Sequence, residues 1–330
     1  MLQLKNNTPF VANFAIFPDH QAIDTLYLMV KATFLIGDQW TLAAEQIPLQ
    51  QADEYLGDPA HSSLKTISEY HIGKPSTDIL MFGLAYSLGQ RPVRHMDVGF
   101  EVGSLRKSAR IFGDRIWQDN QITMPDAFVS MPLVYERAFG GQDVVNQQIR
   151  ATEARNPVGK GFVGQKAAAE LNGIALPNIE SPYELIINWQ DKPNPVGFGP
   201  IASGWSPRVT LAGTYDQVWQ MQRAPYLPDD FNPRFLNSAP ADQIYPGFIK
   251  GGELVRIIGM HPEGDFQFNL PYVNLVNKVI INGETLSAPF QMETLSLYPN
   301  QRQLTMTWRA AIPCEKRLLK IEQMTISLSR

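Results

Sequence analysis

Seven carboxylates lie close in sequence to aromatic residues, a composition found in carbohydrate-processing clefts. Two carboxylates that face each other across a groove can hydrolyse a glycosidic bond, one as the acid and the other as the base or nucleophile. The same side chains beside proline and glycine commonly hydrogen-bond to their own backbone and shape turns. The sequence leaves both interpretations open, because it gives no distances between side chains. The seven residues are Glu136, Glu180, Asp216, Asp229, Asp230, Asp242 and Glu253.

Other patterns of catalytic or ligand-binding residues are weak. Residues 159–164 match the glycine pattern of dinucleotide-binding loops. The preceding Arg155–Val158 is not a buried strand, although the phosphate-binding mechanism needs a parallel strand–helix–strand unit. The histidines form no closely spaced pair, and the single cysteine, Cys314, provides no zinc-ligand spacing. We therefore expect no catalytic residue, no cofactor and no bound metal.

The segment Lys192–Pro246 is unusual because it holds nine of the 25 prolines together with many aromatic residues. Proline removes a backbone donor and fixes φ, so the segment is unsuited to central strands and helix interiors. Its aromatic residues are too numerous for a flexible linker. The sequence predicts a long loop with its own anchors on a β scaffold, and loops of this length are usually functional.

Aromatic and arginine side chains in and near this loop are the candidate partner contacts. Such residues dominate the energetic centres of protein interfaces. The same chemistry also fixes loops inside a protein through stacking and bidentate ion pairs, and for Arg137 and Arg208 the sequence favours this internal anchoring. The predicted contacts are Phe139, Phe198, Trp205, Arg208, Phe231 and Arg234.

Strand signals dominate the elements that must position these side chains. Leu26–Ile36 is rich in β-branched and aromatic residues, and turn pairs such as Asn282-Gly283 separate short apolar runs. The best helix formers are confined to Gly164–Leu171. The predicted fold is mainly β, with two β-rich, sandwich-like lobes, a short helical connection and long loops rich in proline and aromatic residues. The predicted boundaries are 1–145 for the N-terminal lobe, 146–182 for the helical connection and 183–330 for the loop-rich lobe.

The charge balance excludes several classes of partner. The chain has 330 residues, a formal net charge of −4 and 18% charged residues, which gives no basic footprint for nucleic acid or anionic lipid. The cluster Arg106, Lys107 and Arg110 is interpreted as a solvated face. No apolar run reaches the roughly 20 residues of a membrane-spanning helix, no signal-peptide pattern is present, and one cysteine suits a reducing compartment. We expect a cytoplasmic protein that binds no nucleic acid and does not insert into a membrane.

Short segments in a fixed order carry a family resemblance. The segments are NTPF (7–10), VKATF (30–34), KPSTD (74–78), FGDRIW (112–117), MPLVYERAFGG (131–141), NPVG (156–159), LPNIE (176–180), GFGPI (197–201), WSPR (205–208), GTYD (213–216) and DDFNPRF (229–235). With these segments, from about residue 7 to at least 270, the chain resembles a family of type VI secretion accessory proteins built on a domain of unknown function.

The resemblance implies a non-catalytic adaptor or chaperone. Members of that family are associated with loading a toxin effector, often one with a PAAR tip domain, onto the VgrG spike before secretion. The expected partners are therefore a PAAR-containing effector and VgrG. An aromatic, proline-rich loop suits such a role, because interface cores are depleted in charge. Two alternatives stay open: a carbohydrate-active or other hydrolase that uses paired carboxylates, and a structural component of the secretion particle.

Overall fold

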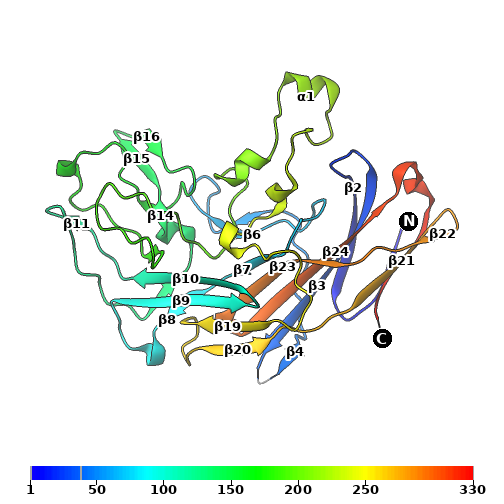
Figure 1. Cartoon of the computed structure of the whole chain (residues 1–330), viewed down its shortest axis with the longest axis horizontal. Coiled ribbons are helices and arrows are strands. Elements are labelled where there is room, and N and C mark those ends of the chain that lie inside the picture. The colour runs from blue at the N-terminus through cyan, green and yellow to red at the C-terminus, as the bar shows by residue number, and fades with distance from the viewer. Residues whose placement is uncertain (1, 38, 330) are drawn as a thin grey trace.

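The computed structural model describes residues 2–37 and 39–329, and its mainly β architecture confirms the predicted fold class (Figure 1). Three sheets of four to six strands share one hydrophobic core. That core contains side chains from both ends of the chain, among them Leu28, Val98, Val255 and Leu295. Strands far apart in sequence therefore depend on one another for burial.

The six-stranded sheet is built around β3 (Asp24–Ile36), in which every residue from Thr25 to Phe34 is buried. A strand covered on both faces is a nearly continuous apolar run, which explains the composition of this segment. The neighbouring strands are antiparallel except β7, which pairs with β23 in parallel. The sheet order is β2 (Val11–Pro18), β3, β24 (Gln303–Pro313), β23 (Gln291–Tyr298) and β7 (Asp78–Met81), with β4 (Trp40–Leu42) paired to the end of β3.

The five-stranded sheet is antiparallel and forms the platform below the long loop (Figure 1). Its order is β18 (Ile179–Glu180), β10 (Leu105–Phe112), β9 (His95–Val102), β19 (Leu254–Ile258) and β20 (Phe266–Asn269). The four-stranded sheet has the order β1 (Leu4–Asn7), β25 (Ile321–Leu328), β21 (Leu275–Ile281) and β22 (Glu284–Leu286).

Shorter elements complete the described residues. Two-stranded pairs are β5 (Glu54–Tyr55) with β6 (Leu64–Thr66), β8 (Leu84–Tyr86) with β13 (Ser130–Pro132), β11 (Trp117–Gln118) with β12 (Gln121–Ile122), β14 (Phe139–Gly140) with β17 (Lys160–Gly161), and β15 (Gln142–Val145) with β16 (Gln148–Thr152). The 3-10 helices are η1 (Leu88–Gln90), η2 (Tyr135–Arg137), η3 (Ala168–Glu170), η4 (Arg208–Leu211), η5 (Pro233–Leu236), η6 (Ala241–Gln243), η7 (Pro299–Gln301) and η8 (Glu315–Lys320). The α-helix α1 (Gln217–Gln222) projects from the body at the top of Figure 1.

The predicted boundaries 1–145, 146–182 and 183–330 do not coincide with the sheets, because both larger sheets combine strands from the first and last ranges. The predicted helical connection is reduced to η3, and the rest of 146–182 contains short strands and turns. Gly164 at the start of the expected helix has a left-handed φ of +60° and approaches Asp143 closely. A helix of a few residues is marginal without tertiary support, so good helix formers alone are insufficient here.

The long loop has the predicted character. Within the described residues no strand lies between Glu180 and Leu254, and aromatic side chains fix the segment to the scaffold. Phe198 packs on Phe100 of the platform with ring centroids 6.3 Å apart. Trp205 meets Tyr135 edge to face at 5.5 Å. These contacts account for an ordered loop whose regular structure is limited to short helices.

Candidate functional site

A cleft of about 780 Å³ lies between the platform sheet and the long loop. Phe100 on β9, Lys107 on β10 and Ile258 on β19 belong to its sheet side. The opposite side comes from residues 181–184, 194–196 and 201–244, including η4, η5 and η6. A concave site with apolar walls and a few polar groups is typical of a ligand-binding or partner-binding surface.

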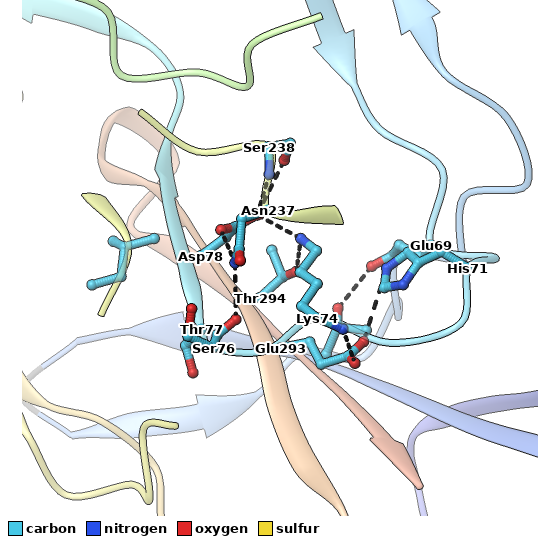
Figure 2. A network of polar contacts seen from close by, with 12 residues as sticks. Glu69, His71, Lys74, Ser76, Thr77, Asp78, Asn237, Ser238, Glu293 and Thr294 are labelled. Carbon is cyan, nitrogen blue, oxygen red and sulfur yellow. Dashed lines mark hydrogen bonds and ion pairs between the residues drawn. The ribbon is translucent and has the colours of Figure 1, made fainter. Parts of the chain in front are cut away.

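A buried ion pair holds the loop side of this cleft in place. Lys74 Nζ and Asp78 Oδ2 lie 2.7 Å apart, and both side chains have 0% exposure. The same Asp78 carboxylate accepts hydrogen bonds from Asn237 Nδ2 at 2.8 Å and from the Ser238 backbone N–H at 2.8 Å. Figure 2 shows Asn237 and Ser238 beside Asp78, at the strand β7. The KPSTD segment therefore joins the loop to the six-stranded sheet, which sets the shape of the cleft.

Asn237 and Ser238 are not the only residues that attach this part of the loop to β7. Gln243, which is fully buried in η6, donates from Nε2 to the backbone carbonyls of Ile79 and Phe198. Thr77 next to Asp78 accepts a hydrogen bond from the Ile249 backbone N–H at 3.0 Å. The loop wall from 237 to 249 is thus tied to one strand at several points, which favours a preformed cleft.

Further ionic groups surround this pair inside the protein. Lys31 Nζ lies 2.9 Å from Glu69 Oε2, and Arg309 Nε lies 2.7 Å from Glu293 Oε2. The largely buried His71 ring lies next to Arg309, with 3.4 Å between its Nε2 and Arg309 Nη2. Burial, reinforced by the positive charges of Arg309, Lys74 and Arg208, holds the pKa of His71 well below its ordinary value. His71 is therefore neutral near pH 7.

Lys107 is the buried cation on the sheet side of the cleft. Its Nζ lies 2.8 Å from Asp242 Oδ1 and 5.4 Å from the centroid of the Phe198 ring. Burial lowers the pKa of Lys107, and the carboxylate of Asp242 opposes that shift. The pair connects β10 to η6, so it closes the cleft between the sheet and the loop.

Two of the predicted contact residues, Arg208 and Arg234, line the cleft. Arg208 is half-buried, and its guanidinium donates from Nε to the Phe235 carbonyl and from Nη1 to the Ile201 carbonyl. Arg234 is exposed on η5 and has no ion-pair or side-chain hydrogen-bond partner within 2–37 and 39–329.

The four predicted aromatic contacts are buried inside the chain and are therefore not available to a partner. Phe139 packs in a cluster with Trp117 and Leu171, and Phe198 joins the main core. Trp205 and Phe231 are each 9% exposed. For Phe198, Trp205 and Phe231, the cause is the need to bury large apolar surface in a segment that has no strand and only short helices.

The seven carboxylates are placed as turn-forming groups or ion-pair partners, and among them only Asp242 lines the cleft. Glu136 accepts from the Ser63 backbone N–H and hydroxyl, and Asp230 from the same two groups of Thr214. Asp216 caps α1 by accepting from the Trp219 N–H. Glu180 pairs with Arg115, Asp229 with Arg223 and Asp242 with Lys107, while Glu253 accepts from two backbone N–H groups. The arrangement brings no two of the seven together in the cleft.

Local sequence patterns do not identify every residue of the cleft. Lys107 is buried, so its interpretation as part of a solvated face is wrong. The signal was present in the period of two along β10, where Lys107 alternates with exposed Arg106 and Ser108 and takes a buried position like Ala109. Tyr183, 91% exposed at the cleft, had no sequence signal to distinguish it.

The cleft contains no histidine or cysteine among its lining residues. Within 2–37 and 39–329, no three His, Cys, Asp or Glu side chains are grouped so as to hold a metal ion. None of the helices in the described part of the chain is long and apolar enough to span a membrane. The side chains that line the cleft are suited to hydrogen bonding, ion pairing and apolar contact.

The comparisons with known proteins place the chain in a bacterial family. The model of a family described as "uncharacterized protein conserved in bacteria (DUF2169)" matches residues 21–309. No curated protein and no solved structure matches the chain.

Proposed function

Because the chain belongs to the uncharacterized bacterial family DUF2169, we propose a function from its cleft and from the segment resemblance: it is a non-catalytic adaptor that binds a protein partner. The partner that we propose is a type VI secretion effector with a PAAR tip domain, which the adaptor helps to load onto the VgrG spike. The secretion role comes from the resemblance of the ordered segments, and the cleft is the proposed partner site.

The observation that carries the binding role is a preformed cleft whose ionic groups are mostly engaged. Lys107 pairs with Asp242, Arg106 with Glu101 and Arg155 with Glu153. Side chains held in this way cost little additional entropy when a partner binds. Of the three carboxylates that line the cleft, Asp242 and Glu101 each have a cation beside them, and Glu184 accepts a hydrogen bond from the Asn194 backbone N–H. These properties support binding rather than turnover.

A tagged pull-down from native lysate of the source bacterium tests this proposal. We expect a PAAR-containing effector or VgrG to be recovered, with identification by mass spectrometry. The bait is compared with an Asp78→Asn variant, in which the loop wall of the cleft loses its ion-pair anchor to Lys74. Recovery of neither protein under secretion-active conditions would contradict the adaptor function.

A second measurement separates an adaptor from a structural component of the secretion particle. An adaptor stays inside the cell after it has delivered its effector, whereas a component leaves with the spike. Immunoblots of culture supernatant, with a secreted spike protein as positive control and a cytoplasmic enzyme as lysis control, distinguish the two. Stoichiometric secretion with the spike would replace the adaptor proposal by the structural one.

A further inference from the structure

The side chains that line the cleft carry a net positive charge, whereas the whole chain has a net negative charge. The protein has a formal net charge of −4, yet five basic and three acidic side chains line the cleft. Most of the basic groups already have an acidic neighbour, as described for Lys107, Arg106 and Arg155. Arg208 and Arg234 have no carboxylate within 4.0 Å among the described residues, so they are the cations open to a partner.

Arg208 is held in a fixed orientation before any partner arrives. Its Nε and Nη1 are occupied by the Phe235 and Ile201 carbonyls at 2.9 and 2.7 Å, and its guanidinium lies 5.1 Å from the Phe235 ring centroid. Its Nη2 has no acceptor within the described ranges and keeps some access to solvent. The Nη2 group of the fixed Arg208 guanidinium therefore remains a free donor for an anion.

Arg234 lies on the adjacent helix η5, which packs against η4, the helix that begins at Arg208. The backbone of Arg234 is fixed, because Asn232 caps η5 and accepts from the Arg234 N–H at 3.0 Å. Its side chain is exposed and lines the same cleft. The hydrogen bond from Arg208 to the Phe235 carbonyl joins η4 to η5, so the two arginines are carried by one connected unit.

We propose that this pair recognises a carboxylate on an extended segment of the polypeptide partner. For its partner class this inference rests on the proposed adaptor function. Guanidinium groups match carboxylates in geometry and charge. Apolar side chains at Phe100, Leu211 and Ile258 line the same cleft and can take the neighbouring side chains of such a segment. The carboxylate comes either from an aspartate or glutamate side chain or from the C-terminus of the partner.

A polypeptide fits the cleft better than a nucleic acid does. Nucleic-acid sites follow a phosphate chain with many basic groups, whereas here two open cations stand among three acidic side chains. Tyr183 at the cleft is 91% exposed and offers a further apolar and hydrogen-bonding surface, as is common where proteins bind proteins.

The test uses the purified full chain and fluorescein-labelled ten-residue peptides that alternate glutamate with leucine, measured by fluorescence anisotropy. Matched peptides carry glutamine in place of glutamate, and each sequence is made with a free or an amidated C-terminus. If a side-chain carboxylate is recognised, both glutamate peptides bind and neither glutamine peptide does. If the terminal carboxylate is recognised, only the free-acid peptides bind.

Arg234→Gln should weaken binding of the preferred peptide by about tenfold, since a hydrogen bond to a charged group contributes enough for such a change. Arg91→Gln is the matched control, because Arg91 is exposed, lies outside the cleft and has no side-chain partner in the described residues. Circular dichroism should show unchanged folding for both variants. Equal binding of all four peptides, no binding, or equal affinity of the Arg234→Gln variant overturns the inference. Tighter binding of a labelled ten-nucleotide single-stranded DNA also overturns it, in favour of a phosphate site.

Failure of this inference is distinguishable from failure of the adaptor function. If wild-type and Arg234→Gln proteins recover the PAAR effector equally from lysate, the adaptor function stands and the carboxylate site does not. If neither recovers a type VI protein while the peptide result holds, the carboxylate site stands and the partner is of another kind.

Discussion

Replacement of Asp78 by asparagine is the sharpest test of how the cleft is held. The carboxylate of Asp78 is fully buried and binds four groups at once: the Lys74 ammonium, the Asn237 amide, and the backbone N–H and hydroxyl of Ser238. Asparagine has nearly the same shape but no charge, so Lys74 loses its counter-ion and keeps neutral acceptors such as the Thr294 hydroxyl, 2.8 Å from its Nζ. An ammonium without a counter-ion is then left in the core.

The expected cost is large compared with the stability of a protein. Removal of one partner of a buried ion pair costs about 3–5 kcal/mol, against a total stability of about 5–15 kcal/mol. For a chain of 330 residues, this corresponds to a fall in melting temperature of roughly 4–7 °C. The exposed pair Lys65–Glu54, with 3.5 Å between Lys65 Nζ and Glu54 Oε2, provides the control. Lys65→Gln should change stability by about 0–1 kcal/mol.

Urea unfolding followed by tryptophan fluorescence measures the global effect, and hydrogen exchange measures the local one. The Ser238 amide should exchange much faster in the Asp78→Asn protein, because its acceptor is weakened. Amides of β3, inside the six-stranded sheet, should remain more strongly protected from exchange than the Ser238 amide. The reasoning is refuted if Asp78→Asn destabilises the protein no more than Lys65→Gln does, or if Ser238 keeps its protection.

Two further predictions concern stability. Trp205→Ala should lower the free energy of unfolding in urea by about 3–5 kcal/mol, because the side chain is buried against Tyr135. As a control, Tyr183→Ala at the exposed rim should change it by no more than about 0.5 kcal/mol. If the Trp205→Ala protein instead loses partner binding at unchanged stability, Trp205 is an interface residue. The pKa of His71 is lowered in the folded protein, whereas in the unfolded chain it is about 6.5. Below pH 6.5 the unfolded chain therefore binds more protons than the folded protein does. Stability should fall as the pH drops from 7.5 towards 5, by up to about 1.4 kcal/mol per pH unit from this group. His71→Gln should flatten that dependence, and an unchanged slope would contradict the assignment.

The β content and the anchored loop could be predicted because both follow from local composition. The apolar run of β3 and the prolines of the long loop limit the backbone directly, whatever the rest of the chain does. The helical connection could not be predicted in the same way. Good helix formers at 166–170 favour a helix, but tertiary contacts around Gly164 and Asp143 determine the result.

The candidate site was harder to predict, because burial is a property of the whole fold. Phe198 and Trp205 are of residue types that are common in protein interfaces. Only their packing against Phe100 and Tyr135 shows that they are buried inside the chain. For Lys107 the prediction was wrong in the opposite direction. A charged residue in a basic cluster is expected to be exposed to solvent, and its burial becomes understandable only with its partner Asp242, 135 residues away. The KPSTD segment signalled a family resemblance, whereas its structural role needs Asn237 and Ser238, which no local pattern connects to it.

The most direct test of the central claim is a site-specific photo-crosslink from the cleft to the partner. A benzophenone amino acid is placed at Tyr183, which is exposed at the cleft, and in a second protein at Leu319, which is exposed on η8 away from it. After irradiation in cells, we predict a covalent adduct with a PAAR-containing effector or VgrG from position 183 and none from position 319. An adduct with either protein from position 319 but none from position 183 would contradict the assignment of the cleft as the partner site.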